Sequence, residues 1–329
     1  MSASSETNAG AKAIAIPLSP SNASTWFGSR GAMPAKLIDG KAIAEQINAE
    51  TVAEIARLKD RHRLTPGLAV ILVGENPASS AYVSMKDKMC ARLGLHSERV
   101  SLPASASEGE LLAIIDDLNF KREIHGILVQ SPLPPQISEE KVFAAVDPTK
   151  DVDGFHPLNI GKLALGDLTG FVPCTPAGVH QLLIRSGVKI DGAHVVVLGR
   201  SRIVGRPISL MLSQKVPNAN ATVTVCHSRS ANLVEICRSA DILIAAIGAP
   251  RFVKADMVRD GAVVIDVGIN RVDDKTAQKG HSIVGDVDFD AVMPKVALIT
   301  PVPGGVGPMT IAMLMHNTVR AAGMRHGTA

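Results

Sequence analysis

Two residues in the first third of the chain have the types and spacing for proton chemistry. Tyr82 and Lys86 lie four residues apart in the segment Pro77–Leu93, whose apolar spacing predicts a helix, so both side chains share one helix face. A lysine on an apolar helix face can be tuned toward the neutral amine and used in proton transfer. A solvated surface lysine is the ordinary alternative, since lysines are rarely buried.

Three more polar residues follow, at the end of a predicted strand and in a loop. Gln130 ends the strand predicted at 126–130, and the carboxyl ends of parallel strands line the ligand crevice of α/β sheets. An amide satisfied within its own loop is the alternative. Asp151 and Asp153 alternate in a polar loop broken by Gly and Pro, where carboxylates bind a metal, cap a helix or accept paired N–H groups from a heterocycle. A metal is the least favoured of these, because no further ligands lie nearby.

A nucleotide-binding corner is indicated at residues 195–207. The apolar run 195–198 predicts a buried parallel strand, Gly199 permits a sharp turn with a close ligand approach, and Pro207 suits the first turn of a helix. Free N–H groups at a helix start form an anion site. The spacing is Gly-x-Ser-x-x-x-Gly-x-Pro rather than Gly-x-Gly-x-x-Gly, so alone it fits an ordinary strand-turn-helix connection equally well.

The loop after the next predicted strand favours NADP over NAD. NAD-selective proteins usually carry Asp or Glu there to hold the ribose hydroxyls. This chain has Ser228 and Arg229 instead, and Arg200 and Arg202 are expected nearby, so the corner suits a 2′-phosphate. A solvated basic loop is the alternative for any one of these arginines.

The elements that must position these residues alternate between strands and helices. Strands are predicted at 68–73, 99–102, 126–130, 195–198, 222–225, 242–247 and 263–267. Helices are predicted at 40–58, 77–93, 108–118, 138–146, 175–186, 208–214, 233–238, 254–258 and 309–322, with a loose connection at 161–170. This alternation predicts an α/β fold with parallel sheets, in which the helix from residue 175 bridges two domains.

The composition is that of a globular protein long enough for two domains, with 329 residues, 46% hydrophobic and 20% charged. The net charge of +3 is too small to indicate nucleic acid as a partner, and no apolar run reaches the length of a membrane span. The four cysteines lack metal-binding spacing and indicate reduced thiols, so a cytoplasmic location is expected. Residues 1–33 lack the features of a secretory signal and are expected to form a disordered tail.

Five motifs occur in order between residues 37 and 323. They are Tyr82-Val83-Ser84-Met85-Lys86, Gly126-Ile127-Leu128-Val129-Gln130-Ser131-Pro132-Leu133-Pro134, Lys150-Asp151-Val152-Asp153-Gly154, Gly199-Arg200-Ser201-Arg202-Ile203-Val204-Gly205-Arg206-Pro207 and Pro301-Val302-Pro303-Gly304-Gly305-Val306-Gly307-Pro308-Met309-Thr310. Each is modest alone, but together they closely resemble the bifunctional methylenetetrahydrofolate dehydrogenase/methenyltetrahydrofolate cyclohydrolase family. The N-terminal tail is the main departure from the family pattern.

The resemblance implies an enzyme with two activities. It would oxidise 5,10-methylenetetrahydrofolate with NADP to the methenyl form, and then hydrolyse this product to 10-formyltetrahydrofolate. The implied domains are a folate-binding catalytic domain of residues 34–172 plus 299–329 and a Rossmann-type NADP-binding domain of residues 173–298, which flank a cleft. The resemblance also implies a homodimer whose substrates are tetrahydrofolate derivatives.

The resemblance further assigns roles to single residues. Lys86 is the catalytic residue of the hydrolysis, Tyr82 stacks near the folate, and Gln130 orients Lys86. The implied substrate-binding residues are Tyr82, Asp151, Asp153, Pro303, Gly304 and Gly305, and Asp153 is the one that recognises the pterin. Cofactor contacts fall on Gly199, Arg200, Ser201, Gly205, His227, Ser228, Arg229 and Ile269. No metal-binding residue is expected.

Three other interpretations stay open at this point. A shikimate-type NADP dehydrogenase shares the two-domain layout, but the loops at residues 130–134 and 303–308 argue against it. A family member that keeps only the dehydrogenase is compatible with the sequence, because cyclohydrolase activity depends on the surroundings of Lys86. A non-enzymatic NADP-binding scaffold would need no lysine in a cleft and would produce no NADPH.

Overall fold

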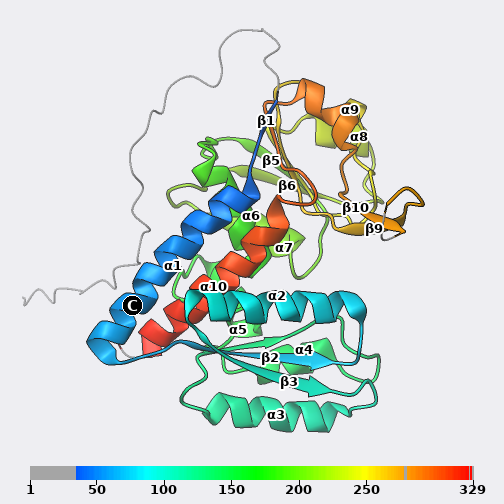
Figure 1. The fold of residues 1–329 in the computed structure, drawn as a ribbon. Helices are drawn as coiled ribbons and strands as arrows, with labels where there is room; N and C mark the ends of the chain where they lie inside the picture. The colour runs from blue at the N-terminus through cyan, green and yellow to red at the C-terminus, as the bar shows by residue number, and fades with distance from the viewer. Residues whose placement is uncertain (1–34, 278–279, 326, 328–329) are drawn as a thin grey trace, which may run out of the picture.

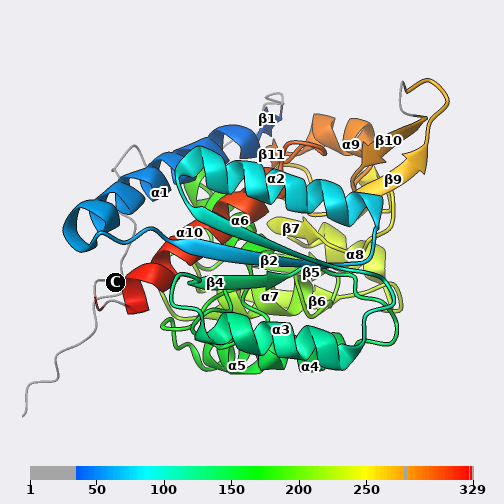
Figure 2. The ribbon, with the colours of Figure 1, turned by 60° about the horizontal axis from the view of Figure 1, so that its bottom comes forward.

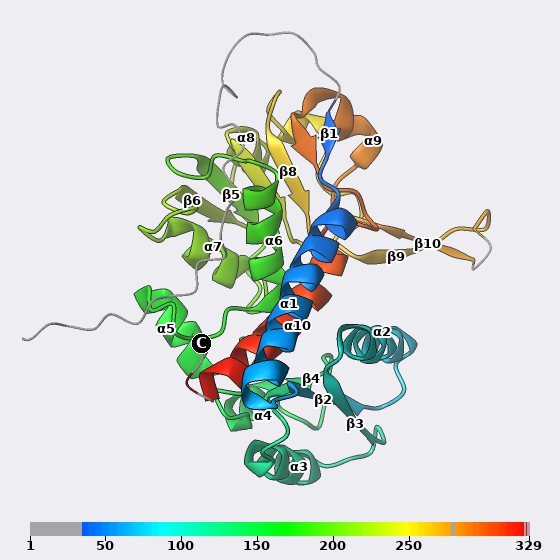
Figure 3. The same ribbon diagram turned by 60° about the vertical axis from the view of Figure 1, so that its left-hand side comes forward.

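The computed structural model describes residues 35–277, 280–325 and 327, so the tail predicted at residues 1–33 lies outside the described residues. Two parallel sheets, one of three strands and one of six, lie at opposite ends of the molecule. Two long helices, α1 (Gly40–His62) and α10 (Val306–Arg325), run side by side between them (Figures 1 and 3). The predicted α/β class with parallel sheets is confirmed.

The remaining elements follow in chain order. The first half contains β1 (Lys36–Leu37), β2 (Gly67–Val73), α2 (Pro77–Leu93), β3 (His96–Leu102), α3 (Glu108–Phe120), β4 (Gly126–Val129), α4 (Glu139–Ala145), α5 (Pro157–Leu165) and α6 (Cys174–Arg185). The second half contains β5 (His194–Leu198), α7 (Gly205–Ser213), β6 (Thr222–Cys226), α8 (Leu233–Arg238), β7 (Ile242–Ala245), η1 (Ala255–Met257), β8 (Val263–Asp266), β9 (Asn270–Asp273), β10 (His281–Val284), α9 (Phe289–Val292), η2 (Met293–Lys295) and β11 (Leu298–Ile299).

The three-stranded sheet has the order β3-β2-β4, with both pairs parallel. All seven residues of β2 are buried, because β2 is the central strand and has helices on both faces. Helices α3 and α4 cover one face and α2 covers the other (Figure 2). Ser107 and Glu110 form a capping box that fixes the start of α3.

The six-stranded sheet has the order β1-β11-β8-β7-β5-β6 and is parallel throughout. Chain order reverses at β5, because β6 lies on one side of it and β7 on the other. Ligands of doubly wound sheets bind outside the carboxyl ends of the strands at this kind of reversal. Gly199, which follows β5, is therefore at the expected binding edge.

Helix α10 holds the two parts together through close backbone approaches. A Cβ atom on Gly178 of α6 would lie 2.8 Å from the Cβ of Met309 on α10, so only glycine permits this packing. A Cβ atom on Gly40 would lie 1.9 Å from the carbonyl oxygen of Gly305, so the start of α1 rests on the loop that precedes α10. Asp39 caps this start by accepting from the N–H groups of Lys41 and Ala42.

The structure corrects several element predictions. The loose connection predicted at 161–170 is wrong in its first half, because α5 continues to Leu165 and ends on Gly166 in the left-handed region. The helix predicted at 254–258 is the short 3-10 turn η1. The β9–β10 hairpin and the pair β1–β11 were not predicted, and the second of these adds the first strand of the described residues to the six-stranded sheet. The domain limits stay a prediction.

Candidate active site

Lys86 and Gln130 meet between α2 and the end of β4. The Nζ atom of Lys86 donates to Oε1 of Gln130 at 2.8 Å, and Lys86 is only 7% exposed. The other end of the Gln130 amide donates to the carbonyl oxygen of Ser131 at 2.7 Å, which turns Oε1 toward the lysine. Burial lowers the pKa of Lys86, and nearby Asp153 and Cys174 partly oppose this shift. Burial thus makes the ammonium form of Lys86 less favourable than it is in water, which is the direction that a role in proton transfer requires.

Asp153 lies beside this lysine in the loop between α4 and α5. Burial raises the pKa of Asp153 to about 6, although the charge of Lys86 and a hydrogen bond from Cys174 act in the opposite direction. Burial also raises the pKa of the Cys174 thiol well above its usual range, so this group stays protonated and can donate. The charges of Lys86 and Asp153 therefore influence each other at the edge of the small sheet.

Asp151 is buried and engaged within its own loop. Its carboxylate accepts from the backbone N–H groups of Phe155 at 3.0 Å and His156 at 2.8 Å, and from the side chain of Asn159 at 2.8 Å. These bonds hold the loop that carries Asp153. The geometry gives Asp151 the part of holding the loop, and a contact of Asp151 with substrate stays a prediction.

Tyr82 lies one helical turn before Lys86 on α2 and is half-buried. Burial raises the pKa of its phenol, so the ring is neutral at physiological pH. A flat, neutral ring on the same helix face as the lysine can stack against a planar ligand.

The loop of Pro303, Gly304 and Gly305 connects β11 to α10. Gly304 has a φ of +110°, and a Cβ atom on Gly305 would lie 2.6 Å from the carbonyl oxygen of Pro301. Both positions therefore need glycine, Gly304 for its backbone conformation and Gly305 for its close packing.

The turn after β5 is tight enough to demand glycine twice. Gly199 has a φ of +133°, and a Cβ atom there would lie 2.0 Å from the carbonyl oxygen of Ala246. A Cβ atom on Gly205 would lie 2.2 Å from the carbonyl oxygen of Gly199. The hydroxyl of Ser201 caps α7 by accepting from the N–H groups of Val204 and Gly205 at 3.1 and 3.3 Å, and its own proton can still be donated.

The predicted basic residues differ in what they contact. Arg200 and Arg229 are exposed, as is Ser228, and His227 accepts from the N–H group of Arg229 at 3.2 Å. Arg202, by contrast, forms an ion pair with Glu140 at 2.6 Å. Glu140 is on α4, which covers the three-stranded sheet, so this pair joins the two parts of the molecule. Arg200 and Arg229 are therefore better placed than Arg202 to meet a phosphate.

Two aspartates that the sequence analysis did not single out shape the binding edge near Ile269. Asp266 accepts from the N–H groups of Gly268, Asp286 and Val287, each at 2.9 Å. Asp286 in turn accepts from the N–H groups of Ile247 and Gly248 and from the side chain of Asn270, at 2.7, 2.8 and 2.8 Å. These bonds join the loops after β7, β8 and β10, and Ile269 is 50% exposed on the joined loops.

Cys174, Asn159 and Asn317 were also missed, although a signal for two of them is present. Each asparagine is a polar residue at a position that the helical period of α5 or α10 turns inward, and each is buried. A polar residue at such a position indicates a hydrogen bond to a loop. Cys174 gives no such signal, since buried cysteine is common in cores.

Two family models cover most of the chain. Residues 38–153 match the tetrahydrofolate dehydrogenase/cyclohydrolase catalytic domain, and residues 173–326 match the corresponding NAD(P)-binding domain. The chain belongs to the tetrahydrofolate dehydrogenase/cyclohydrolase family. The resemblance seen in the five motifs is confirmed, and membership of this family decides against a shikimate-type dehydrogenase.

Curated relatives in the tetrahydrofolate dehydrogenase/cyclohydrolase family are similar over nearly their whole length. The bifunctional protein FolD of Dehalococcoides mccartyi (strain CBDB1) is 55% identical over 290 residues, which cover 88% of this chain and 97% of that protein. The bifunctional protein FolD 2 of Geobacter sulfurreducens is 53% identical over 290 residues, which cover 88% of this chain and 98% of that protein.

Solved structures of the family have the same fold. The bifunctional FolD enzyme of Campylobacter jejuni is 47% identical, with a TM-score of 0.83 over 88% of this chain and 99% of that chain. The Trypanosoma brucei enzyme, solved with NADP cofactor and an inhibitor, is 40% identical, with a TM-score of 0.85 over 90% of this chain and 100% of that chain.

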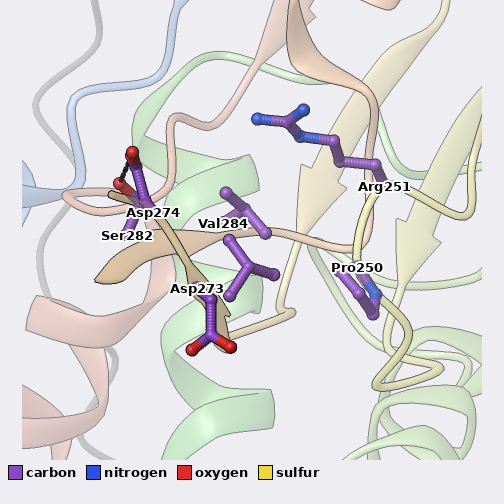
Figure 4. A pocket seen from close by; sticks show the side chains of 7 residues that line it. Pro250, Arg251, Asp273, Asp274, Ser282 and Val284 are labelled. Atoms are coloured by element: carbon purple, nitrogen blue, oxygen red, sulfur yellow. Dashed lines mark hydrogen bonds between the residues drawn. The ribbon is translucent and has the colours of Figure 1, made fainter. Parts of the chain in front are cut away.

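Two surface hollows lie away from Lys86, Gln130 and Asp153, which we call the Lys86 cluster. One of about 360 Å³ lies beside the β9–β10 hairpin, where Asp274 is already bonded to Ser282 at 2.5 Å (Figure 4). The other, of about 320 Å³, lies between α4 and α7 near the Arg202–Glu140 pair. In the part of the chain that the structure describes, no group of acidic, His or Cys side chains could hold a metal ion, and no helix is long and apolar enough to cross a membrane.

Proposed function

We propose that the chain is a bifunctional enzyme that oxidises 5,10-methylenetetrahydrofolate with NADP⁺ and hydrolyses the methenyl product to 10-formyltetrahydrofolate. The observation that carries this proposal is the 2.8 Å contact between the buried Lys86 and Gln130, with Asp153 beside it, in a chain of this family. The curated relatives carry the name bifunctional protein FolD, and one solved relative holds NADP.

For the oxidation the chain has to position two ligands. The cofactor residues fit a dinucleotide, because Gly199 and Gly205 permit the tight turn that leads from β5 into α7, and Arg200 and Arg229 are exposed. NADP⁺, when bound, supplies the hydride acceptor. We propose that the pterin binds to the carboxylate of Asp153 and stacks on the ring of Tyr82. The backbone of Pro303, Gly304 and Gly305 would form a further contact with the folate. Hydride transfer needs positioning more than an acid or a base.

For the hydrolysis the chain has to move protons. Water must lose a proton as it attacks the methenyl carbon, and a ring nitrogen must gain one. Burial keeps the amine of Lys86 available as the proton acceptor, and the carbonyl oxygen of Gln130 holds that amine in place. A bound cationic substrate would disfavour the ammonium form further.

The remaining assignments belong to this proposal as well. The catalytic domain is assigned residues 34–172 plus 299–329, and the NADP-binding domain residues 173–298. We propose a homodimer in the cytoplasm that acts on tetrahydrofolate derivatives, with neither nucleic acid nor membrane as a partner. All four cysteines are buried and free of disulfide bonds, and this supports the cytoplasm as the compartment.

One spectrophotometric assay tests the proposed function. The purified chain is mixed with 5,10-methylenetetrahydrofolate and NADP⁺, and the absorbance of NADPH and of the methenyl product is followed. NADPH should form while the methenyl product stays low, because it is hydrolysed. Accumulation of the methenyl product in step with NADPH would identify a dehydrogenase without cyclohydrolase activity. If no NADPH forms, the chain is a binding protein and not an enzyme of this kind.

A further inference from the structure

Asn317 on α10 is a buried polar residue that reaches the loop of Asp153. Its Nδ2 atom lies 2.9 Å from the carbonyl oxygen of Val152, 3.4 Å from that of Val172 and 3.7 Å from the sulfur of Cys174. The side chain is 5% exposed, so these are its partners rather than water. One amide thus joins α10, the Asp153 loop and the start of α6.

The bond to Val152 acts directly on Asp153. The carbonyl of Val152 belongs to the peptide unit that enters Asp153, and this unit is planar. Fixing the carbonyl therefore fixes the backbone from which the Asp153 side chain starts. The opposite side of the loop is anchored separately, through Asp151 and the N–H groups of Phe155 and His156.

Asn317 shares its main partner with Cys174. The thiol of Cys174 donates to the carbonyl oxygen of Val152 at 3.3 Å, and the amide of Asn317 donates to the same oxygen at 2.9 Å. A carbonyl oxygen has two lone pairs, so it can accept both bonds. Donors from α10 and from the start of α6 thus hold the one carbonyl that precedes Asp153.

We propose that Asn317 is a positioning residue for substrate binding, which holds Asp153 in place through the carbonyl of Val152. This inference rests on the proposed function, since it assigns Asn317 to the folate half of the reaction. It places the effect on the folate and not on NADP⁺, because every partner of Asn317 lies on the Asp153 side.

The test compares three variants in the dehydrogenase assay. Asn317→Leu keeps the branched shape of the side chain and removes the donor, so KM for 5,10-methylenetetrahydrofolate should rise about tenfold while KM for NADP⁺ changes by less than about twofold. Thr318→Val is the matched control, because the hydroxyl of Thr318 is equally buried and bonds only within α10, to the carbonyl oxygen of Leu314 at 2.8 Å. It should leave both KM values unchanged.

Asn317→Asp adds a readout that a merely structural role would not move. A charged carboxylate would face the carbonyl oxygen of Val152 and repel it, whereas the protonated acid can donate to that oxygen. The ratio of its folate KM to that of the wild type should therefore fall as the pH is lowered from about 8 to about 6.

Three results would overturn the inference in an active wild-type enzyme. They are an unchanged folate KM in Asn317→Leu, an equal rise in Thr318→Val, and a ratio for Asn317→Asp that does not depend on pH. A wild-type chain that makes no NADPH from 5,10-methylenetetrahydrofolate would instead overturn the proposed function, and the role of Asn317 with it.

Discussion

The chemistry of Lys86 depends on its surroundings more than on its identity. A free lysine titrates at a pKa near 10.4, too high for a base at neutral pH. In this chain the side chain of Lys86 is buried. The side-chain amide of Gln130 donates to the carbonyl oxygen of Ser131, and this bond turns the amide oxygen of Gln130 toward Lys86. Burial lowers the pKa of Lys86, which is the direction that a proton acceptor requires.

Asp153→Asn should weaken folate binding while NADP⁺ binding stays nearly unchanged. Asparagine has one acceptor where the carboxylate has two, and it adds a donor that would face the donors of the pterin. The expected rise in the folate KM is about tenfold or more. Unchanged folate affinity together with lost NADP⁺ affinity, measured by titration, would refute the assignment of Asp153 to the pterin.

The pH dependence of the wild type provides an internal check on Asp153. Its pKa is raised to about 6, so the carboxylate is present above this pH and is lost as the pH falls through it. The folate KM of the wild type should therefore rise below pH 6, and that of Asp153→Asn should not follow it.

The cofactor preference can be tested at Arg200 and Arg229. Each charge-assisted contact to a phosphate contributes about 1.5–3 kcal/mol, so two contacts favour NADP⁺ over NAD⁺ by roughly a hundredfold or more. The double variant Arg200→Ala/Arg229→Ala should lose this preference in kcat/KM, whereas Arg202→Ala should retain it, because Arg202 pairs with Glu140. Equal kcat/KM values for the two cofactors in the wild type would contradict the assignment.

Single residues were predictable from the sequence where the residue type has a specific chemical or steric reason at its position in a motif. Lys86 and the two glycines Gly199 and Gly205 belong to motifs in which each residue has a chemical or steric reason. Cys174 was not predictable, because buried cysteine is common in cores. The inward position of Asn317 indicates a hydrogen bond, but its partner, the carbonyl of Val152, is 165 residues away in the chain. Only the packing of α10 against the Asp153 loop brings these groups together.

Among the elements, those with clear end signals were predicted best. Helix α2 has Pro77 at its start and Gly94 after its end, and its bounds agree with the prediction. Helix α5 was missed because Gly161 interrupts its pattern and its capping residue is His156, which is not among the usual N-cap residues. Short pairs such as β1 and β11 have too few residues to show an alternating pattern.

Gly205→Ala tests whether the turn after β5 needs its close backbone contact. The added methyl group would lie 2.2 Å from the carbonyl oxygen of Gly199, so the start of α7 would have to move. We expect a loss of about 1–3 kcal/mol in the free energy of unfolding and a raised KM for NADP⁺. The folate KM should change little, because the Lys86 cluster is on the other sheet.

Gly161→Ala is the matched control for this prediction. Gly161 lies inside α5, and nothing lies within 4 Å of a Cβ atom placed on it. Replacing a helical glycine by alanine should stabilise the protein by about 0.5–1 kcal/mol, which is measurable as a higher Tm. A lower Tm for Gly161→Ala, or an unchanged Tm and NADP⁺ KM for Gly205→Ala, would contradict the packing described for these two segments.

At the scale of the whole molecule, the arrangement brings one cluster from each sheet to facing edges. The Lys86 cluster lies at the carboxyl ends of the small sheet, and the Gly199 turn lies at the reversal point of the large sheet. Helices α1 and α10 connect these parts, and α10 begins at the loop of Gly304 and Gly305. The parallel α/β class followed from the alternation of elements, but the entry of β1 into the large sheet did not, since it depends on a contact with β11 far along the chain.

The claim that Lys86 is the catalytic residue of the hydrolysis, and is not needed for the oxidation, is tested most directly by Lys86→Met. Methionine fills the space of the buried lysine without an amine, so hydride transfer, which depends on positioning, should continue. In single-turnover traces, the variant should form NADPH and then accumulate 5,10-methenyltetrahydrofolate, and Lys86→Arg should do the same, because guanidinium does not give up its proton. Disappearance of the methenyl compound at the wild-type rate in Lys86→Met would show that Lys86 is not the catalytic residue of the hydrolysis.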